Sequence, residues 1–551
     1  MVSPASFFER LKAHDASLWS SDPATQALIR DRLGWLALHE TMASSAPQLT
    51  EFAEWVQSLG FRHAVLLGMG GSSLAPEVFQ RTFGAAPGFP ELTVLDTTDP
   101  FSIIRAENRI DTPATLFIVS SKSGTTIETA SLHRYFAERT VDATGDTGAL
   151  DNFAAITDPE TTLHRAAREQ GFHRVFVNPP DIGGRFSALS FFGLVPAAAI
   201  GIDTARLLES ASALDGVEAA ALGQRLAALA QEGRNKLTFL TAPGLESFGA
   251  WAEQLVAEST GKNGVGIVPV DGEPPGDPNV YGDDRVFVSM QLAGREDETT
   301  DAARQLEAAG HPVIQIHVPD AYALGAEFLR WEIAIAAAGA VLDINPFDEP
   351  NVAESKENTS RLIQQFELTG ALPNPAPVLE ENGLSLSADE ATLARLEDAA
   401  ERSIGALVAE HFRRAVKGSY LAITAFIPQT EEHERLLTRL RTALRDATHC
   451  ATTVGFGPRY LHSTGQLHKG GPPTGVFLQL VMTDETDIDI PGEGGLTFGV
   501  LKRAQALGDL QALLSRRRPV LRVSLGDEPA ANLRLLVDTV EAALRETAER
   551  R

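Results

Sequence analysis

Residues 63–79 read HAVLLGMGGSSLAPEVF, an apolar run followed by a glycine-rich turn and then by helix-forming residues. This pattern predicts a β-strand, a tight loop and the start of a helix. Free backbone N–H groups at such a helix start can bind a phosphate group. The segment therefore predicts a phosphate site, and a dinucleotide, a nucleoside triphosphate and a sugar phosphate are its candidate ligands.

Two of these ligands have sequence fingerprints that can be compared with this loop. A dinucleotide loop has the pattern G-x-G-x-x-G and an acidic residue at the end of the next strand. Gly68, Gly70 and Asp96 fit that pattern, but Ser73 stands in place of the third glycine, so the nicotinamide interpretation is weakened and stays open. A nucleoside triphosphate loop of the Walker type needs Gly-Lys-Ser/Thr, which is absent here.

A second polar loop follows the third predicted strand, counted from the strand at residues 63–68. The segment LFIVSSKSGTTIET places Ser121, Ser123, Thr125 and Thr126 directly after an apolar strand and before another helix. Because parallel strands bring their carboxyl ends to one edge of a sheet, both loops are expected to meet around one small anion. A sugar phosphate fits two converging loops better than the pyrophosphate of a dinucleotide does.

The chain predicts an α/β protein with two parallel-sheet α-β-α subdomains and a third C-terminal α/β domain. Short apolar and β-branched runs alternate with helical stretches, which is typical of right-handed crossovers and parallel sheets. A Pro- and Gly-rich stretch after the second set of strands reads as a linker. The expected division is a helical segment 1–60, α/β units 61–225 and 226–372, a linker 373–387 and a C-terminal α/β domain 388–551.

Composition limits the function classes. The 551 residues include 47 basic and 73 acidic side chains, and the net charge is −26. Because the chain is this acidic, it is a poor candidate for binding nucleic acid or an anionic membrane. A phosphate must therefore be held by a local cluster of donors.

The location expected from the sequence is the cytoplasm. Cys450 is the only cysteine, so no internal disulfide can form. The N-terminus lacks the pattern of a signal peptide. The longest apolar stretch, ALSFFGLVPAAAIGI, is too short to span a bilayer and predicts a buried core helix. No Cys/His cluster has zinc-ligand spacing, so we expect neither a metal nor a cofactor.

The motifs as a set resemble the phosphoglucose isomerase family. GMGGSSL and SKSGTT look like the two phosphate motifs of the sugar-isomerase fold. Later motifs occur in the order GGRFS (183–187), AESTGKNG (257–264), NPFDEPNVAESK (345–356) and LHSTGQ (461–466). The C-terminal part further resembles the isomerase half of bacterial transaldolase–isomerase fusions, and we expect the transaldolase half to be absent.

The resemblance implies cofactor-free interconversion of glucose 6-phosphate and fructose 6-phosphate through a cis-enediol, a step of glycolysis and gluconeogenesis. It implies Glu258 as the base, Arg185 beside the enediol, and Lys356 and His462 as groups that help to open the sugar ring. Many members have a substrate-contacting Gln where this chain has Glu349. The substrate-binding set implied is Gly71, Ser72, Ser121, Lys122, Ser123, Thr126, Glu128 and Glu349.

The chemistry of the reaction requires these residue types independently. One carboxylate must remove a proton from C2 and return it to C1, which contributes about 10²- to 10⁴-fold in rate. The developing oxyanion needs a fixed positive group, and a guanidinium stays charged. Ring opening needs a proton donor and acceptor that works near neutral pH, as His does.

The position of the His motif departs from the family order. In the family the His motif follows soon after the Glu motif and comes from a neighbouring subunit, so a homodimer is a candidate assembly. Here LHSTGQ comes after the Lys motif, inside the third block. We therefore expect that block to carry His462 into the site, from the same chain or from a partner.

Alternative functions are a dual phosphoglucose/phosphomannose isomerase and a non-catalytic sugar-phosphate regulator. Such regulators usually carry one sugar-isomerase unit and a DNA-binding domain, whereas this chain is acidic and has two expected units. A glutamine-dependent aminosugar synthase needs an N-terminal Cys, and residue 2 is Val.

Overall fold

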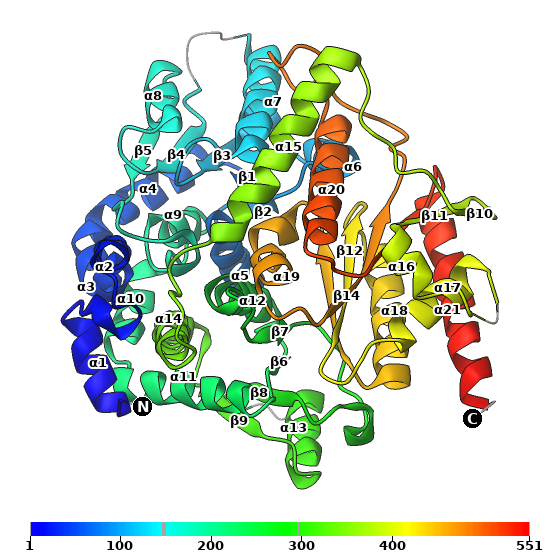
Figure 1. Ribbon diagram of the computed structural model, residues 1–551. Helices are drawn as coiled ribbons and strands as arrows, with labels where there is room; N and C mark the ends of the chain where they lie inside the picture. Colours follow the sequence, from blue (N-terminus) through cyan, green and yellow to red (C-terminus); the bar gives the residue numbers. More distant parts are fainter. Residues whose placement is uncertain (1, 146–149, 295–296, 400, 550–551) are drawn as a thin grey trace.

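The computed structural model describes residues 2–145, 150–294, 297–399 and 401–549, whose arrangement is seen in Figure 1. Within these ranges the strands form three sheets. The first has the order β2-β1-β3-β4-β5, and all its pairings are parallel. Its strands are β1 (His63–Gly68), β2 (Glu91–Leu95), β3 (Thr115–Ser120), β4 (Phe153–Thr157) and β5 (Arg174–Val177).

The second sheet is parallel, and the third is parallel except for an antiparallel edge. Their orders are β7-β6-β8-β9 and β10-β11-β15-β14-β12-β13. The second comprises β6 (Lys236–Thr241), β7 (Val268–Val270), β8 (Arg285–Leu292) and β9 (Val313–Val318). The third comprises β10 (Leu379–Glu381), β11 (Leu384–Ala388), β12 (Tyr420–Phe426), β13 (Ala451–Phe456), β14 (Gly475–Val481) and β15 (Val520–Ser524).

All three sheets contain the same strand order. When the parallel strands of a sheet are counted in chain order, the second lies on one side of the first. The third and fourth follow on the other side of the first: β2-β1-β3-β4, β7-β6-β8-β9 and β13-β12-β14-β15. The α/β class predicted from the sequence, with parallel sheets in successive units, is confirmed. In this order the first and third strands are neighbours, so the loops after both strands emerge side by side at the carboxyl edge.

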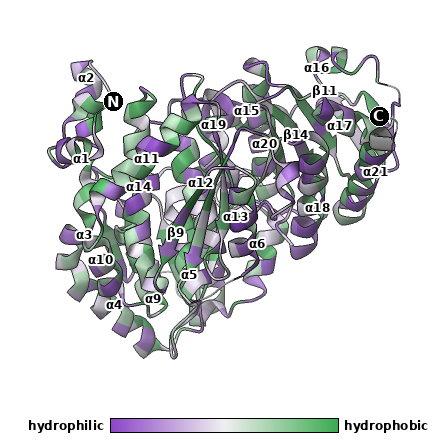
Figure 2. Ribbon diagram, turned by 90° about the horizontal axis from the view of Figure 1, so that it is seen from below, coloured by the Kyte–Doolittle hydropathy of each residue, from purple (hydrophilic) through white to green (hydrophobic). Residues whose placement is uncertain are grey.

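Helices cover the sheets. The N-terminal part is helical, with α1 to α4 at one end of the molecule and α17, α18 and α21 at the other (Figure 2). Helix α9 is buried along its whole length, as the apolar stretch around it predicts. No helix among the described residues is long and apolar enough to cross a membrane. The helices are α1 (Pro4–Lys12), α2 (Pro23–Arg30), α3 (Leu38–Thr41), α4 (Ala46–Leu59), α5 (Leu74–Phe83), α6 (Pro100–Glu107), α7 (Ile127–Thr144), α8 (Thr162–Glu169), α9 (Phe191–Ala199), α10 (Thr204–Ser212), α11 (Gly216–Gln231), α12 (Glu246–Thr260), α13 (Glu298–Ala308), α14 (Leu324–Val341), α15 (Pro350–Thr369), α16 (Glu390–Ala394), α17 (Ile404–Arg413), α18 (Glu431–Thr448), α19 (Gly465–Gly470), α20 (Phe498–Ser515) and α21 (Pro529–Glu549).

The C-terminal block shares hydrophobic cores with the rest of the chain. Helices α15 and α20 lie side by side (Figure 1), and Leu362 and Leu501 belong to one buried cluster that also includes α7. Tyr135 of α7 meets Phe498 of α20 edge to face, with ring centroids 5.9 Å apart. Burying a large apolar side chain contributes about 1.5–3 kcal/mol. The third block is therefore held against the first sheet unit by apolar packing.

The segment 373–387, expected as a linker, contains a β-hairpin. Glu381 pairs with Leu384, so the turn consists of Asn382 and Gly383, which have φ angles of 50° and 81°. Positive φ at both turn residues is the type I′ hairpin that Asn-Gly favours. Strand β11 then pairs antiparallel with β15, so this segment forms the edge of the third sheet. The proposed domain boundaries otherwise stay a prediction.

Candidate active site

The two predicted phosphate loops lie next to each other because β1 and β3 are paired. Gly68 is opposite Ser120 in this pairing, at the carboxyl ends of both strands. The second loop is closed by its own hydroxyls: Ser121 Oγ accepts the Gly124 N–H at 3.1 Å and donates to Thr126 Oγ1 at 3.2 Å. Both loops lead into helices, α5 and α7, so their N–H groups face one region of the sheet edge.

The first loop needs glycine because three other segments approach its backbone. Gly70 has φ +57°, and a Cβ there would lie 2.8 Å from Gln254 Nε2 and 3.0 Å from the His462 carbonyl oxygen. A Cβ on Gly71 would lie 1.9 Å from the Gly184 carbonyl oxygen. The glycines thus allow the GGRFS turn, helix α12 and the His motif to converge on this loop.

Arg185 is buried and fixed by backbone and side-chain acceptors. Its Nε donates to Ser259 Oγ at 2.8 Å. Its Nη2 donates to the carbonyl oxygens of Pro346 at 2.7 Å and Asp348 at 2.9 Å. The Arg185 side chain is 3% exposed, so its charge acts inside the protein and not in bulk water. Its plane is set by these partners before any ligand arrives.

Two carboxylates share the remaining guanidinium nitrogen of Arg185, Nη1. Its Nη1 lies 3.0 Å from Glu349 Oε2 and 3.5 Å from Glu258 Oε2. Glu258, near the end of α12, is buried, and this burial is the main reason why its pKa rises to about 7. Arg185 and His462 oppose the increase, whereas the charge of Glu349 adds to it. A carboxyl group with this pKa can accept and return a proton near neutral pH.

His462 reaches the site from the third block of the same chain. Its Nε2 lies 2.9 Å from Glu128 Oε1, and its carbonyl oxygen accepts a hydrogen bond from Gln254 Nε2 at 2.7 Å. Gln505 of α20 donates to the same Glu128 oxygen at 2.7 Å, and Thr98 Oγ1 donates to Gln505 Oε1 at 2.7 Å. The imidazole is therefore held at a defined place between α7 and α20.

Gln254 and Gln505 were not predicted from the sequence. Gln254 lies one helical turn before Glu258, a spacing that could have suggested it. Gln505 had no signal, because nothing in the sequence of α20 indicates that it packs against Glu128.

Glu128 stays ionised although it is buried. Burial raises its pKa, but the charge and hydrogen bond of His462, its own backbone N–H and the charge of Lys356 together bring the pKa below its usual value. An ionised carboxylate only accepts hydrogen bonds. His462 must therefore carry a proton on Nε2. Among the described residues the one hydrogen bond of the His462 ring is that of Nε2 to Glu128, so Nδ1 is available to a ligand.

A cavity of about 180 Å³ opens between the second loop, α15 and the His motif. Thr126, Glu128, Lys356 and His462 line it, together with Gln505. Four residues predicted from three separate motifs thus surround one space.

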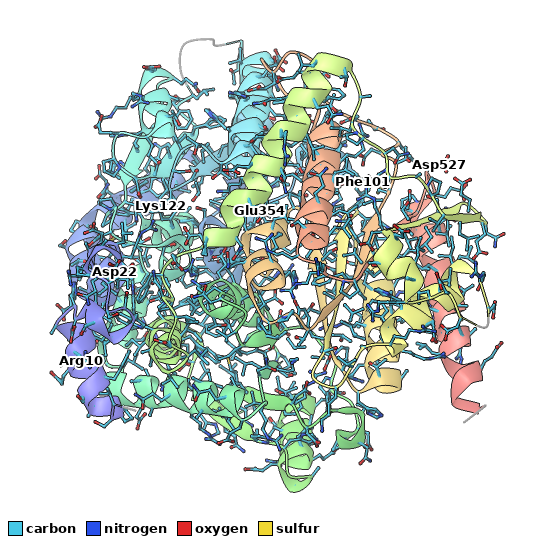
Figure 3. All side chains as sticks on the ribbon, viewed as in Figure 1. Arg10, Asp22, Phe101, Lys122, Glu354 and Asp527 are labelled. Atoms are coloured by element: carbon cyan, nitrogen blue, oxygen red, sulfur yellow. The ribbon has the colours of Figure 1, made fainter. Side chains whose placement is uncertain are left out.

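Lys122 and Ser123 have other partners in this structure. Lys122 Nζ forms an ion pair with Asp158 and donates to the Pro180 carbonyl oxygen at 2.9 Å. Ser123 Oγ is 3.0 Å from Thr125 Oγ1 and accepts the Thr125 N–H at 3.2 Å. Lys122, two residues after β3, is labelled in Figure 3. The roles of both residues in substrate binding stay predictions.

Asp96 does not behave as the acidic residue of a dinucleotide site. Its carboxylate accepts the Ser73 hydroxyl at 3.0 Å and lies 3.4 Å from Arg459 Nη1. Ser73, the residue that replaces the third glycine, therefore uses the carboxylate that would bind a ribose. Among the described residues no group of three or more His, Cys, Asp or Glu side chains could hold a metal ion.

The fold and site define a protein of the sugar-isomerase class. The family model for phosphoglucose isomerase matches residues 42–231. A glucose-6-phosphate isomerase of Rubrobacter xylanophilus is 32% identical over 391 residues, which cover 61% of this chain and 90% of that protein. One of Mycoplasmopsis pulmonis is 26% identical, with 60% and 90% covered. The chain belongs to the phosphoglucose isomerase family.

A solved structure supports the fold. A hypothetical protein of Thermus thermophilus superposes with a TM-score of 0.55 at 24% identity, covering 67% of this chain and 97% of that one.

Proposed function

We propose that the chain interconverts glucose 6-phosphate and fructose 6-phosphate. The observation that carries this proposal is the buried Glu258 with a pKa of about 7, 3.5 Å from the fixed guanidinium of Arg185. A base with a matched pKa beside a permanent cation is what proton transfer through an enediolate requires. Membership of the phosphoglucose isomerase family supports the substrate.

The phosphate group of the substrate would bind at the two loops. Ser72, Ser121, Ser123 and Thr126 supply hydroxyl donors, and the N–H groups at the starts of α5 and α7 supply backbone donors. The proximity of these loops supports this assignment. The phosphate then fixes the sugar so that C1 and C2 lie near the carboxylate of Glu258.

The chemical step uses Glu258 and Arg185 in different roles. Glu258 Oε would take the proton from C2 of the open-chain aldose and return it to C1. The negative charge that develops on the substrate oxygen would be stabilised by Arg185, whose position does not need to change during the reaction because its partners already fix it.

Ring opening would use His462 and Lys356. Because Glu128 accepts the Nε2 proton of His462, Nδ1 is the nitrogen that can exchange a proton with the sugar. Lys356 lines the same cavity and supplies a positive charge. Glu128 and Gln505 act on this step through the orientation of the imidazole.

The third block would supply His462 within one chain. The family receives this His from a neighbouring subunit, whereas the 2.9 Å contact here joins His462 to Glu128 of the same chain. This contact supports a complete site in one chain, and a homodimer is not needed to build it. The cytoplasm stays the proposed location, supported by a single cysteine, Cys450, that is buried and free.

The test is an isomerase assay with the full chain. Fructose 6-phosphate is added without nucleotide and with a chelator, and the formation of glucose 6-phosphate is measured. We expect conversion, and we expect Glu258→Gln to convert at least about 100-fold more slowly while it still binds substrate. Absence of conversion by folded protein would refute the proposal. Dependence on a divalent ion would overturn the metal-free mechanism.

A further inference from the structure

The third sheet has a cavity of its own at its carboxyl edge. The cavity has a volume of about 230 Å³ and is lined at the ends of β12, β14 and β15 by Phe426, Val481 and Ser524. In open α/β sheets the carboxyl edge, where neighbouring strands connect in opposite directions, is the usual place of a ligand. The equivalent strands of the first sheet, β1 and β3, carry the two phosphate loops. The cavity therefore occupies the position at which this architecture binds ligands.

A mostly buried cation without a counter-ion faces this cavity. Arg522 of β15 lines it and donates from Nη1 to Gln479 Oε1, a neutral amide on the adjacent strand. No carboxylate in the described part of the chain forms an ion pair with Arg522, whose partner is Gln479. Burial lowers the pKa of this guanidinium to about 10, and the nearby Tyr460 opposes that effect. The side chain is still charged at neutral pH, and buried charges are normally paired.

The other groups around the cavity add a second cation and residues that carry hydroxyl groups. Arg503 of α20 lines it and is 42% exposed, with its nearest carboxylate, that of Asp484, 4.0 Å away. Thr483 and Ser524, which carry hydroxyl groups, line the same space. Lys502 pairs with Asp99 and Asp484, which lie outside the lining. Among the described lining residues, the cations Lys502, Arg503 and Arg522 stand against one carboxylate, Glu380. The lining thus has a positive excess in a chain whose net charge is −26.

We propose that this cavity is a second binding site, specific for a small phosphorylated ligand, with Arg522 and Arg503 on the phosphate. Two guanidinium groups and several hydroxyls offer more donors than the two oxygens of a carboxylate can use, and they match the oxygens of a phosphate. The volume equals that of about eight water molecules, at about 30 Å³ each, which leaves space for a few carbon atoms beside the phosphate.

The proposed second site is separate from the active site. The two cavities share no lining residue in the described part of the chain, and α20 lies between them. Gln505 of α20 faces Glu128, whereas Arg503 and Ala506 line the second cavity. Binding at each site can therefore be removed separately.

The experiment is calorimetric titration of the full chain with inorganic phosphate. We expect two phosphates per wild-type chain. Ser123→Ala/Thr126→Ala should weaken or remove the active-site phosphate and keep the Arg522-dependent one. Arg522→Gln should do the reverse. If the two loops do not bind the substrate phosphate, the first of these losses is missing, while the second still decides the present inference.

Two controls separate loss of the site from unfolding and from the loss of a positive charge. Arg503→Gln changes an exposed side chain, so it should fold and weaken the second phosphate several-fold to about tenfold. The matched control is Arg435→Gln on α18, an exposed arginine outside the cavity, which should bind as the wild type does. The inference is overturned if Arg522→Gln and Arg503→Gln both bind phosphate as the wild type does. It is also overturned if the second site binds malonate and not phosphate, since the ligand class would then be a carboxylate.

Discussion

Glu349→Gln tests whether a second carboxylate sets the pKa of the proposed base. Glu349 lies 3.0 Å from the same Nη1 of Arg185 that lies 3.5 Å from Glu258. The charge of Glu349 raises the pKa of Glu258, and the ion pair of Glu349 occupies the arginine. A glutamine keeps the shape, can still accept from Arg185 and removes the charge. The pKa of Glu258 should therefore fall.

The size of this decrease follows from the geometry. The two carboxylate oxygens are at most 6.5 Å apart, because 3.0 Å and 3.5 Å separate them from the same nitrogen. At that distance the repulsion is about 2.6 kcal/mol at an effective dielectric constant of about 20, and about 0.6 kcal/mol in water. The Glu349 side chain is 38% exposed, so solvent screening places the value between these limits. With about 1.4 kcal/mol per pH unit, we expect a decrease of about one unit.

The assay is kcat/KM for glucose 6-phosphate between pH 5.5 and about pH 8.5, since this quantity reports ionisations of the free enzyme. Glu258 must be deprotonated to act as a base, so wild-type kcat/KM should increase with pH through about pH 7. The phosphate group of the substrate ionises near pH 6, and this affects the wild type and Glu349→Gln equally. Dividing kcat/KM of the variant by kcat/KM of the wild type at each pH removes this contribution. A shift of one unit makes that ratio about fivefold larger at pH 6 than at pH 8.

The matched control is Glu354→Gln. Glu354 lies on α15, where it is labelled in Figure 3, and forms an ion pair with Arg516. The substitution removes the same charge, but Glu354 is not a partner of Arg185, so its ratio should not change with pH. An unchanged ratio in Glu349→Gln, or a shift toward higher pH, would refute the role given to Glu349.

Four further variants test the rest of the site. Glu258→Gln should lower kcat at least about 10²-fold and leave substrate binding measurable by calorimetry, because proton transfer and phosphate contacts are separate contributions. Ser123→Ala with Thr126→Ala should raise KM well over tenfold, since each hydrogen bond to a charged group contributes about 1.5–3 kcal/mol; an unchanged KM would mean that the loop only caps α7. His462→Ala should slow ring-closed glucose 6-phosphate far more than an open-chain substrate analogue, and equal losses would assign His462 another step. Gln505→Leu should lower kcat about tenfold, but not in the His462→Ala background, if it acts through the imidazole.

The sequence predicted the fold where a strand is a continuous apolar run. Strands β1, β3 and β14 are buried throughout or almost throughout, and their sequences show it. Strand β13, with the sequence ATTVGF, was missed because it is polar, contains a glycine and lies at the edge of the sheet. The hairpin of β10 and β11 was missed although Asn382-Gly383 is a strong local signal, because the surrounding prolines suggested a linker.

The site was predictable in its residue types and not in its contacts. The motifs named Arg185, Glu258 and His462, and the structure brings these side chains into one buried region. The sharing of Arg185 by Glu349 could not be predicted, because it depends on where the start of α15 meets the GGRFS turn. The role of Gln505 depends on the docking of α20 against α7, a contact between segments separated by 377 positions.

Two sheet units of the same chain hold the His motif, one at its backbone and one at its side chain. The His462 carbonyl is bound by Gln254 of α12, beside the proposed base, and its imidazole by Glu128 of α7, beside the proposed phosphate loop. Helix α19, which follows the motif, packs on both α12 and α15. The position of His462 is thus set by the surfaces that it contacts. Because the third block also shares buried clusters with the first two sheets, removing it would expose apolar cores, and point variants at His462 separate its chemistry from folding.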